Sequence, residues 1–298
     1  EFRMFARNPE RNIRLGGKWI AFAPVGGPPN CSDLDKGRRP GTLEDCTNFM
    51  KLSQVFNCVH TAGGASVDAL DVHASIRHLH ITRNKMVVSD KVPFASSTGR
   101  PRLFDAIELV RLARGISQEQ LLQEPSTYTV INTNSPLKLD GPMGMGIIEM
   151  ARLNQICVVT PFTLAGAMAP ITLAGALVEQ NAEALAGLCI SQLARPGAPF
   201  VYGGFTSNVD MKSGAPAFGT PEYMKACIVG GQLARRYKLP YRTSSTNAAN
   251  FVDAQAAYES VFSLWGAIMG GGNLIQHAAG WMEGGLVASY AKSALDAD

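Results

Sequence analysis

Four aromatic residues of this chain have the type and spacing to bind a cationic ligand. Phe162, Tyr202, Phe205 and Trp281 lie in, or directly after, apolar runs that end in glycine and small polar residues. Aromatic faces attract quaternary ammonium groups by cation–π interaction, which contributes on the order of 1–2 kcal/mol per desolvated contact. Glycines let a bulky group approach the backbone closely. We therefore expect these four side chains to cage a quaternary ammonium ion. The alternative for Phe162 and Trp281 is that they only pack the interior.

His277 stands near the end of another such run, and acid–base groups are otherwise scarce. Among the polar clusters that follow the runs, only His277 and Asp90 titrate in a useful range. We expect His277 to contact the ligand, and the alternative is a satisfied core histidine. Three other histidines fall within Val72–His80, and their nearest strand partner, Asp90, lies beyond the next expected strand. That spacing is poor for a metal. No Gly-x-Ser-x-Gly elbow is present, and Lys85 sits at the wrong end of its run for a Schiff base. We expect no metal site.

Eight runs rich in Val, Ile, Phe or Tyr must position these residues. The runs are Trp19–Pro24, Val55–His60, Lys85–Asp90, Tyr128–Asn134, Ile156–Thr163, Pro199–Thr206, Pro240–Thr246 and Asn273–Gly280. Strands that alternate with helices form a parallel sheet, and eight of them can close into a barrel whose active site lies in the loops after the strands. The sequence predicts an α/β fold, a single TIM (β/α)8 barrel over residues 1–298. The alternative, an open Rossmann-type sheet, lacks its Gly-x-Gly-x-x-Gly fingerprint after a strand.

Helix-like stretches follow the runs, and several carry end signals. The expected helices are Thr42–Gln54, Ala69–Leu79, Leu103–Arg114, Pro142–Asn154, Pro170–Leu193, Pro221–Tyr237, Asp253–Met269 and one after Gly285. Thr42 with Asp45 resembles a capping box, and Thr220 is a candidate N-cap before Pro221. The Ala- and Leu-rich Leu173–Leu193 faces either the barrel or a second copy of the chain.

Composition narrows the class of protein. With 298 residues, 46% of them hydrophobic and 17% charged, the chain can bury a large core. A net charge of +3 without a basic run argues against nucleic-acid binding. No apolar run has the length of a membrane span. The six cysteines form no Cys-x-x-Cys pair, which indicates reduced thiols in a cytoplasmic protein. The first and last residues look like cut ends, so we expect a chain truncated at both.

Motifs at the strand ends resemble the trimethylamine methyltransferase (MttB) family of corrinoid-dependent methyltransferases. The resemblance rests on five segments: Val25–Asn30 (VGGPPN), Ser135–Asp140, Thr160–Gly166, Gly203–Gly214 with Gly219–Glu222, and His277–Gly285 (HAAGWMEGG). They cover nearly the whole chain. The resemblance implies a TIM barrel that takes a methyl group from a methylamine and gives it to the Co(I) corrinoid of a separate carrier protein. The corrinoid would then be supplied by that partner rather than bound tightly by this chain.

One segment separates this chain from the family members that use trimethylamine. Those enzymes carry pyrrolysine in a segment that should correspond to Thr243–Asn247, where this chain has ordinary residues. A quaternary ammonium is already an activated electrophile, so the protein needs only to hold one methyl group in line with cobalt in a dry site. The chain resembles the members that act on quaternary amines such as glycine betaine. Proline betaine, carnitine and choline-like compounds fit the cage as well.

The resemblance also implies roles for individual residues. Phe162, Tyr202, Phe205 and Trp281 would cage the trimethylammonium group. His277, with Asn208 or Asn247, would hold the substrate carboxylate. Asp210 and Glu283 would tune His277 or contact the corrinoid, and the alternative for both is helix capping or a surface position. Two other functions stay open: a lyase or isomerase on the same barrel, and a non-catalytic barrel that binds quaternary amines.

Overall fold

A ring of parallel strands forms the centre of the protein. The computed structural model describes residues 1–298, and six of its strands follow one another in the order β3, β15, β14, β11, β9, β8. Their bounds are Ala21–Phe22 (β3), Leu274–Gln276 (β15), Tyr241–Ser244 (β14), Phe200–Gly203 (β11), Ile156–Val159 (β9) and Tyr128–Ile131 (β8). All five neighbouring pairs are parallel.

Two more strands complete the ring. β6 (Thr61–Gly63) and β7 (Val92–Pro93) pair in parallel with each other. On one side the amide of Ala95 donates to the carbonyl of Tyr128 at 2.9 Å, which joins β7 to β8. On the other side the amide of His60 donates to the carbonyl of Phe22 at 2.8 Å, which joins β6 to β3. Eight parallel strands thus curl into a closed barrel, and the predicted TIM (β/α)8 fold is confirmed.

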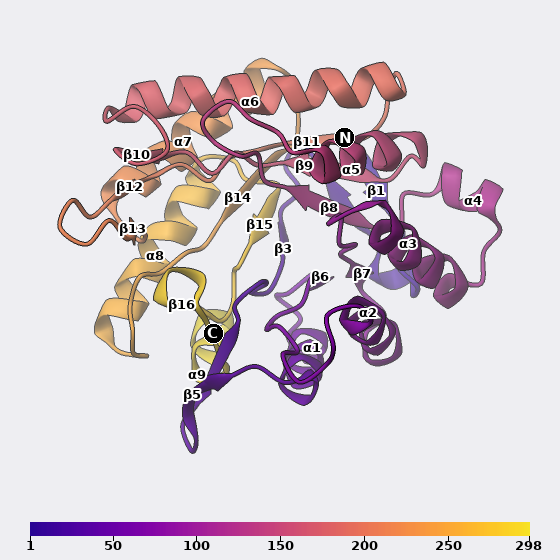
Figure 1. The fold of residues 1–298 in the computed structure, drawn as a ribbon, viewed down its shortest axis with the longest axis horizontal. Helices are drawn as coiled ribbons and strands as arrows, with labels where there is room; N and C mark the ends of the chain where they lie inside the picture. Colours follow the sequence, from indigo (N-terminus) through magenta and orange to yellow (C-terminus); the bar gives the residue numbers. More distant parts are fainter.

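Helices surround the strands on the outside (Figure 1). They are α1 (Leu43–Val55), α2 (Arg77–Val88), α3 (Arg100–Arg114), α4 (Gln118–Gln123), α5 (Gly141–Arg152), α6 (Leu173–Ala194), α7 (Pro221–Arg236), α8 (Ala254–Met269) and α9 (Tyr290–Ala297). Helix α1 begins at a capping box in which Thr42 and Asp45 bond reciprocally, and Thr220 caps α7. Both predicted caps are confirmed. Each cap side chain accepts a hydrogen bond from an amide that the first turn of the helix leaves without a partner.

The loops on the carboxyl side of the strands fold into two small sheets. One joins β10 (Leu164–Ala165), β12 (Ser207–Val209) and β13 (Pro216–Ala217), which follow β9 and β11. The other has the order β16 (Trp281–Met282), β17 (Val287–Ser289), β4 (Asn30–Asp33), β5 (Gly37–Pro40). The short 3-10 helix η2 (Glu283–Gly285) connects β16 to β17. The second sheet therefore ties the loop after the first barrel strand to the loop after the last.

A hairpin near the start of the chain packs on the interior of the barrel. It consists of β1 (Phe2–Met4) and β2 (Ile13–Leu15), joined through the 3-10 helix η1 (Pro9–Arg11). Met4 and Leu15 are fully buried in one apolar cluster with Ile156, Val201 and Leu274. These strand residues lie toward the amino ends of β9, β11 and β15, so the hairpin covers the end of the barrel opposite the loop sheets.

The second and third barrel strands differ from the prediction. Val55–His60 was expected as the second strand, but Val55 ends α1 and the strand is Thr61–Gly63. Lys85–Asp90 was expected as the third strand, but its first four residues belong to α2 and the strand is Val92–Pro93. The helix expected at Ala69–Leu79 begins only at Arg77. A strand of two or three residues carries no period that a sequence can display, so the longer apolar stretch beside it was mistaken for it.

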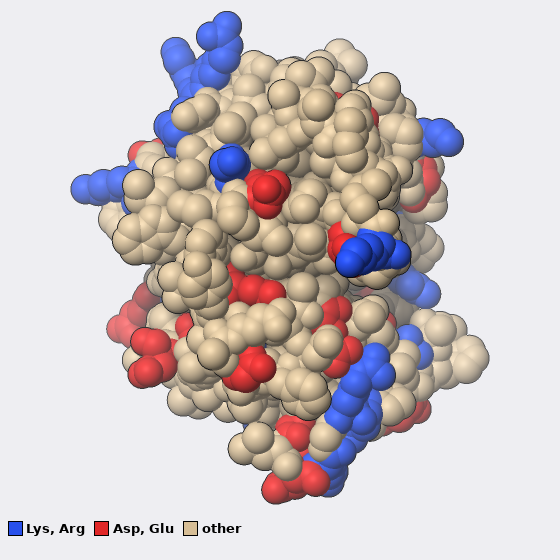
Figure 2. Space-filling model, turned by 90° about the vertical axis from the view of Figure 1, so that its left-hand side faces the viewer, with Lys and Arg blue, Asp and Glu red and all other residues tan.

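Charged residues of both signs are scattered over the molecule. On the face that carries β10, β12 and β13, the upper part of the view is largely uncharged, whereas acidic side chains gather in the lower part beside a short strip of basic ones (Figure 2). No helix of the structure combines the length and apolar character required to cross a membrane.

Candidate functional site

A cavity of about 630 Å³ opens at the carboxyl ends of the barrel strands. Its lining comes from the loops after β3 and β6, from α2, and from the ends of β8, β11, β14 and β15. Phe205, Arg242, Gln276, His277 and Trp281 form one side of this lining. Barrel enzymes carry their active sites at this end of the strands.

The alternation of side chains along each strand decides which residues reach the cavity. In β11, Val201 packs in the barrel interior, whereas Tyr202 packs outside it with Ala234 of α7. In β14, Tyr241 joins the same outer cluster, so Arg242 points inward and lines the cavity.

Arg242 is a buried cation without a partner. Its side chain is 3% exposed, forms no ion pair, and has Nε and Nη1 buried without a hydrogen-bond acceptor. The guanidinium carbon lies 5.3 Å from the centre of the Phe205 ring. Burial lowers the pKa of Arg242 to about 10, despite favourable interaction with Tyr223 and Tyr241. A buried guanidinium that is left unpaired is costly, and it indicates a site for an anion.

A chain of polar side chains in the barrel interior lies below the cavity. The hydroxyl of Tyr128 accepts from Nε2 of Gln276 at 3.2 Å and lies 3.2 Å from Oγ1 of Thr61. These residues come from β8, β15 and β6, and all three are buried. Their mutual hydrogen bonds fix the Gln276 amide, which lines the cavity next to His277.

His277 is held as a neutral hydrogen-bonding group. Its Nδ1 accepts from the amide of Gly26 at 3.3 Å, so its proton resides on Nε2. Burial, followed by the positive charge of Arg242, lowers the pKa of His277 well below its usual range. The backbone of His277 has a φ of 57°, a conformation that non-glycine residues rarely adopt. The imidazole is therefore suited to donate a hydrogen bond rather than to carry charge.

Aromatic rings line the wall beside His277. The Trp281 ring centre lies 4.1 Å from that of His277 and 6.3 Å from that of Phe205. Phe218 is buried behind them, 5.3 Å from Phe205 and 6.3 Å from Trp281. At Gly285 a Cβ atom would fall 2.6 Å from the Trp281 ring, so only glycine fits there. Phe205 and Trp281 thus form an aromatic wall that the close approach of Gly285 keeps in position.

Two of the four aromatic residues expected in the cage lie outside the cavity lining. The Tyr202 hydroxyl donates to Oδ1 of Asn181 at 3.1 Å on α6, so the ring is directed into the helix layer. Phe162 packs behind Phe205 with ring centres 5.1 Å apart. The phase of β11 thus places Tyr202 in the helix layer and not in the expected cage. Phe162 supports the wall without lining it.

The polar residues expected beside His277 form hydrogen bonds with other parts of the chain. Oδ1 of Asn208 accepts from the Thr220 hydroxyl at 3.2 Å, and Asn247 is bonded to Ser260 on α8. Asp210 is exposed, and its carboxylate caps a turn by accepting from the Ser213 hydroxyl at 2.6 Å. None of the three lines the cavity. The structure therefore gives Asn208 and Asn247 partners within the protein, and it places Asp210 at the surface, the alternative expected for it.

Glu283 lies beside the cavity but is directed to a cation. Its Oε2 lies 3.2 Å from Nε of Arg38 on β5, while the next residues, Gly284 and Gly285, line the cavity. The ion pair links η2 to the hairpin of β4 and β5. The structure places Glu283 at the rim and gives it no contact with His277.

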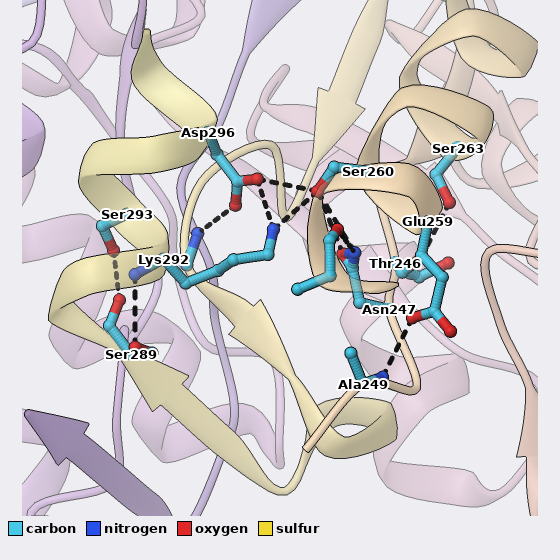
Figure 3. A network of polar contacts seen from close by, with 12 residues as sticks. Thr246, Asn247, Ala249, Glu259, Ser260, Ser263, Ser289, Lys292, Ser293 and Asp296 are labelled. Carbon is cyan, nitrogen blue, oxygen red and sulfur yellow. Dashed lines mark hydrogen bonds and ion pairs between the residues drawn. The ribbon is translucent and has the colours of Figure 1, made fainter. Parts of the chain in front are cut away.

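A buried polar network fastens the aromatic wall to the end of the chain (Figure 3). Lys292 on α9 is fully buried, pairs with Asp296, and donates to the hydroxyl of Ser260 on α8 at 2.6 Å. The Asp296 carboxylate accepts from the amide of Gly280 at 2.9 Å, directly before Trp281. Asn247, bonded to Ser260, accepts with its carbonyl from Gly284 at 2.9 Å. Helices α8 and α9 therefore position the segment that carries His277 and Trp281.

Comparison with known proteins agrees with this geometry. The sequence matches the family described as trimethylamine methyltransferase (MTTB) over residues 1–298. The chain belongs to this family. Among curated MTTB relatives, a glycine betaine methyltransferase of Desulfitobacterium hafniense (strain Y51) is 36% identical over 99% of the chain and 62% of its own length. A trimethylamine methyltransferase of the same species (strain DSM 10664 / DCB-2) is 29% identical over 97% of the chain and 58% of its own length. The chain thus spans about three fifths of the length of these relatives.

Solved structures support the barrel of this MTTB chain. A dihydropteroate synthase from Coxiella burnetii superposes with a TM-score of 0.53 at 12% identity, covering 96% of the chain and 94% of the synthase. At this identity the likeness concerns the fold alone. No group of three or more His, Cys, Asp or Glu side chains in the structure is arranged to hold a metal ion.

Arg242 lines the cavity, although the sequence motifs give it no role in the expected cage. It lies in the run Pro240–Thr246, where an arginine inside an apolar strand was a visible signal. Only the phase of β14 shows that this arginine points inward. Lys85 was expected at the end of a strand that is wrong for a Schiff base. In the structure it belongs to α2 and lines the cavity.

Proposed function

We propose that this chain is the barrel of a methyltransferase that takes a methyl group from a betaine, a quaternary amine bearing a carboxylate. Glycine betaine is the first candidate, and the acceptor is the Co(I) corrinoid of a separate carrier protein. The unpaired Arg242 beside an aromatic wall carries the proposal, because a betaine offers one anion and one quaternary cation. The 36% identical relative is a glycine betaine methyltransferase, which supports the same substrate.

Each end of a betaine has a complementary partner in the cavity. The carboxylate would bind Arg242 and accept from Nε2 of His277, in charge-assisted hydrogen bonds. The trimethylammonium group would lie against the faces of Phe205 and Trp281. His277 must stay uncharged for this arrangement, and the lowered pKa of its imidazole meets that requirement.

The chemistry asks little of the side chains beyond position. The acceptor supplies an electron pair to a methyl carbon, the C–N bond breaks, and its electrons remain on a neutral tertiary amine. No proton moves, so no general acid is needed, in agreement with the uncharged imidazole of His277. The protein contributes alignment and exclusion of water.

The decisive test is methyl transfer by the purified chain. Glycine betaine carrying deuterated methyl groups is mixed with the protein and free cob(I)alamin, and dimethylglycine and methylcobalamin are quantified by mass spectrometry. We expect both products in equal amounts, with none from choline, which lacks the carboxylate. Betaine binding without product would identify a non-catalytic binding protein, and no binding of any quaternary amine would overturn the proposal.

Trp281 and Trp265 form a matched pair for testing the aromatic wall. Trp281→Leu should weaken glycine betaine binding about tenfold, because a desolvated cation–π contact contributes roughly 1–2 kcal/mol. Trp265→Leu, on the outer face of α8 and 58% exposed, should leave binding unchanged. Isothermal titration calorimetry measures both.

A neutral isostere separates the charge from the shape of the ligand. With 3,3-dimethylbutanoate, which replaces the ammonium nitrogen by carbon, affinity should be lower in the wild type and should respond less to Trp281→Leu. Equal sensitivity of both ligands to Trp281→Leu would contradict a cation–π role.

A further inference from the structure

The cavity is lined by more positive charges than the single carboxylate of a betaine can neutralise. Arg77, Lys85, Arg102 and Arg242 all line it, and none of them forms an ion pair with a carboxylate. Asp68 is the only acidic residue of the lining. A zwitterionic betaine brings no net charge, so its carboxylate can compensate Arg242 but none of the other three cations. Asp68 interacts with Arg77, which leaves Lys85 and Arg102 without a negative charge.

All hydrogen bonds of these three cations go to neutral acceptors. Nε of Arg77 donates to the carbonyl of Val72 at 3.1 Å. Nη1 of Arg102 donates to the hydroxyl of Thr98 at 3.3 Å, and Nη2 to a carbonyl at 3.4 Å. The remaining guanidinium donors are free. Arg77, Lys85 and Arg102 are named here the α2–α3 cationic cluster, because they stand on α2 and in the first turn of α3.

Lys85 is the most constrained member of the cluster. It is 2% exposed, and the only hydrogen bond of its ammonium group goes to the carbonyl of Phe94 at 3.0 Å. Burial lowers the pKa of Lys85 to about 8. An ammonium group in such a position is destabilising unless an anion joins it. His78, on the same helix, already has a partner in Asp105 at 2.8 Å.

The cluster and Arg242 stand on different sides of the barrel mouth. Helices α2 and α3 flank β7 in the chain, and around the ring β7 is followed by β8, β9, β11 and then β14, which carries Arg242. Four steps in an eight-stranded ring lead to the opposite wall. In the proposed arrangement the betaine cation contacts Phe205 and Trp281, and its carboxylate binds Arg242. The betaine therefore lies on the β14–β15 side of the cavity.

We propose that the α2–α3 cationic cluster is a second anion-binding site, which takes a phosphate group of a ligand other than the betaine. Phosphate matches the cluster because it presents several oxygens and up to two negative charges to donors that line one cavity from two helices. The site does not depend on the identity of the methyl donor. The cavity would then hold two ligands side by side, with an anion at each wall.

Titration calorimetry with inorganic phosphate tests the site in the whole chain. Lys85→Met and Arg102→Gln should each weaken phosphate binding about tenfold or more, because charge-assisted hydrogen bonds contribute roughly 1.5–3 kcal/mol. Arg102 is partly exposed, so Arg102→Gln keeps the test valid if Lys85→Met fails to fold. Arg236→Gln, an exposed arginine on α7, is the control and should bind phosphate as the wild type does.

Competition with glycine betaine separates this proposal from the proposed function. Saturating phosphate should leave the affinity for glycine betaine within about twofold, and Arg242→Gln should retain phosphate binding. Phosphate binding that is lost in Arg242→Gln, or that displaces betaine, would place the anion at Arg242 and overturn the second site. Equal phosphate affinity in the wild type and in both cluster variants would overturn it as well, whether or not betaine binds.

Discussion

Arg242→Gln should abolish tight binding of glycine betaine and at the same time make the ligand-free protein more stable. The loss of affinity is expected to be about 30-fold or more, because removing one partner of a buried charge pair costs roughly 2–5 kcal/mol. Calorimetric titration with glycine betaine measures this loss. Arg236→Gln, which changes the same residue type on the exposed face of α7, should leave the affinity unchanged.

The gain in stability follows from the direction of the Arg242 pKa. Burial lowers that pKa from its ordinary value to about 10, so the folded state holds the proton less tightly than the unfolded state does. At every pH below 10 this difference destabilises the ligand-free fold, by roughly 3 kcal/mol at about 1.4 kcal/mol per pKa unit. Replacement by neutral glutamine removes that cost.

Thermal unfolding with and without ligand shows both effects together. The variant should unfold a few degrees above the wild type when no ligand is present. Glycine betaine should raise the unfolding temperature of the wild type but not of Arg242→Gln, because only a bound ligand stabilises the native state. A variant that unfolds lower and still responds to betaine would show that Arg242 has a structural role instead.

Lys292→Met should have the largest effect on folding. The lysine is fully buried, and its removal leaves the carboxylate of Asp296 inside the protein without its counter-charge. Breaking a buried pair in this way costs roughly 3–5 kcal/mol. Urea denaturation followed by circular dichroism gives the free energy of unfolding. Arg111→Met, which breaks the exposed Arg111–Glu108 pair, should cost less than about 1 kcal/mol.

A double-mutant cycle distinguishes the ion pair from packing. Asp296→Asn alone and Lys292→Met alone should each destabilise strongly, and the double variant should lose less than the sum of the two. The folded fraction of each variant should also bind glycine betaine more weakly, because Asp296 holds the amide of Gly280 beside the aromatic wall. Full additivity of the unfolding free energies would contradict a coupled pair.

The sequence predicted the barrel well, because long helices and several buried strands carry clear patterns. Helix α7 begins at its predicted residue, since Thr220 and Pro221 are local signals. The third barrel strand was missed because Val92 and Pro93 make a strand too short to have a period. The preceding helix α2 is only weakly amphipathic and ends in two valines. This apolar end resembles a strand in the sequence.

The candidate site was predicted less completely, because the sequence does not show which face of a strand each residue occupies. A strand places consecutive residues on opposite faces, so an error of one position exchanges the barrel interior for the helix layer. The sequence predicts Tyr202 in the cage and gives Arg242 no place there, whereas in the structure Tyr202 packs against the helices and Arg242 lines the cavity. His277, Phe205 and Trp281 follow the ends of the barrel strands β15 and β11, so the alternation within those strands does not decide their direction, and all three line the cavity.

The parallel pairing of β17 with β4 has a consequence for how the protein folds. Ala288 pairs with Cys31, and the bond from Gly26 to His277 joins residues 251 positions apart in the sequence. Contacts of such separation form late, since the entropy of closing a long loop must be met before they contribute stability. During synthesis the first βα loop must wait for nearly the entire barrel to leave the ribosome. The ligand cavity is therefore expected to be the last part of the molecule to become ordered, and hydrogen exchange during refolding should show late protection at Gly26 and Cys31.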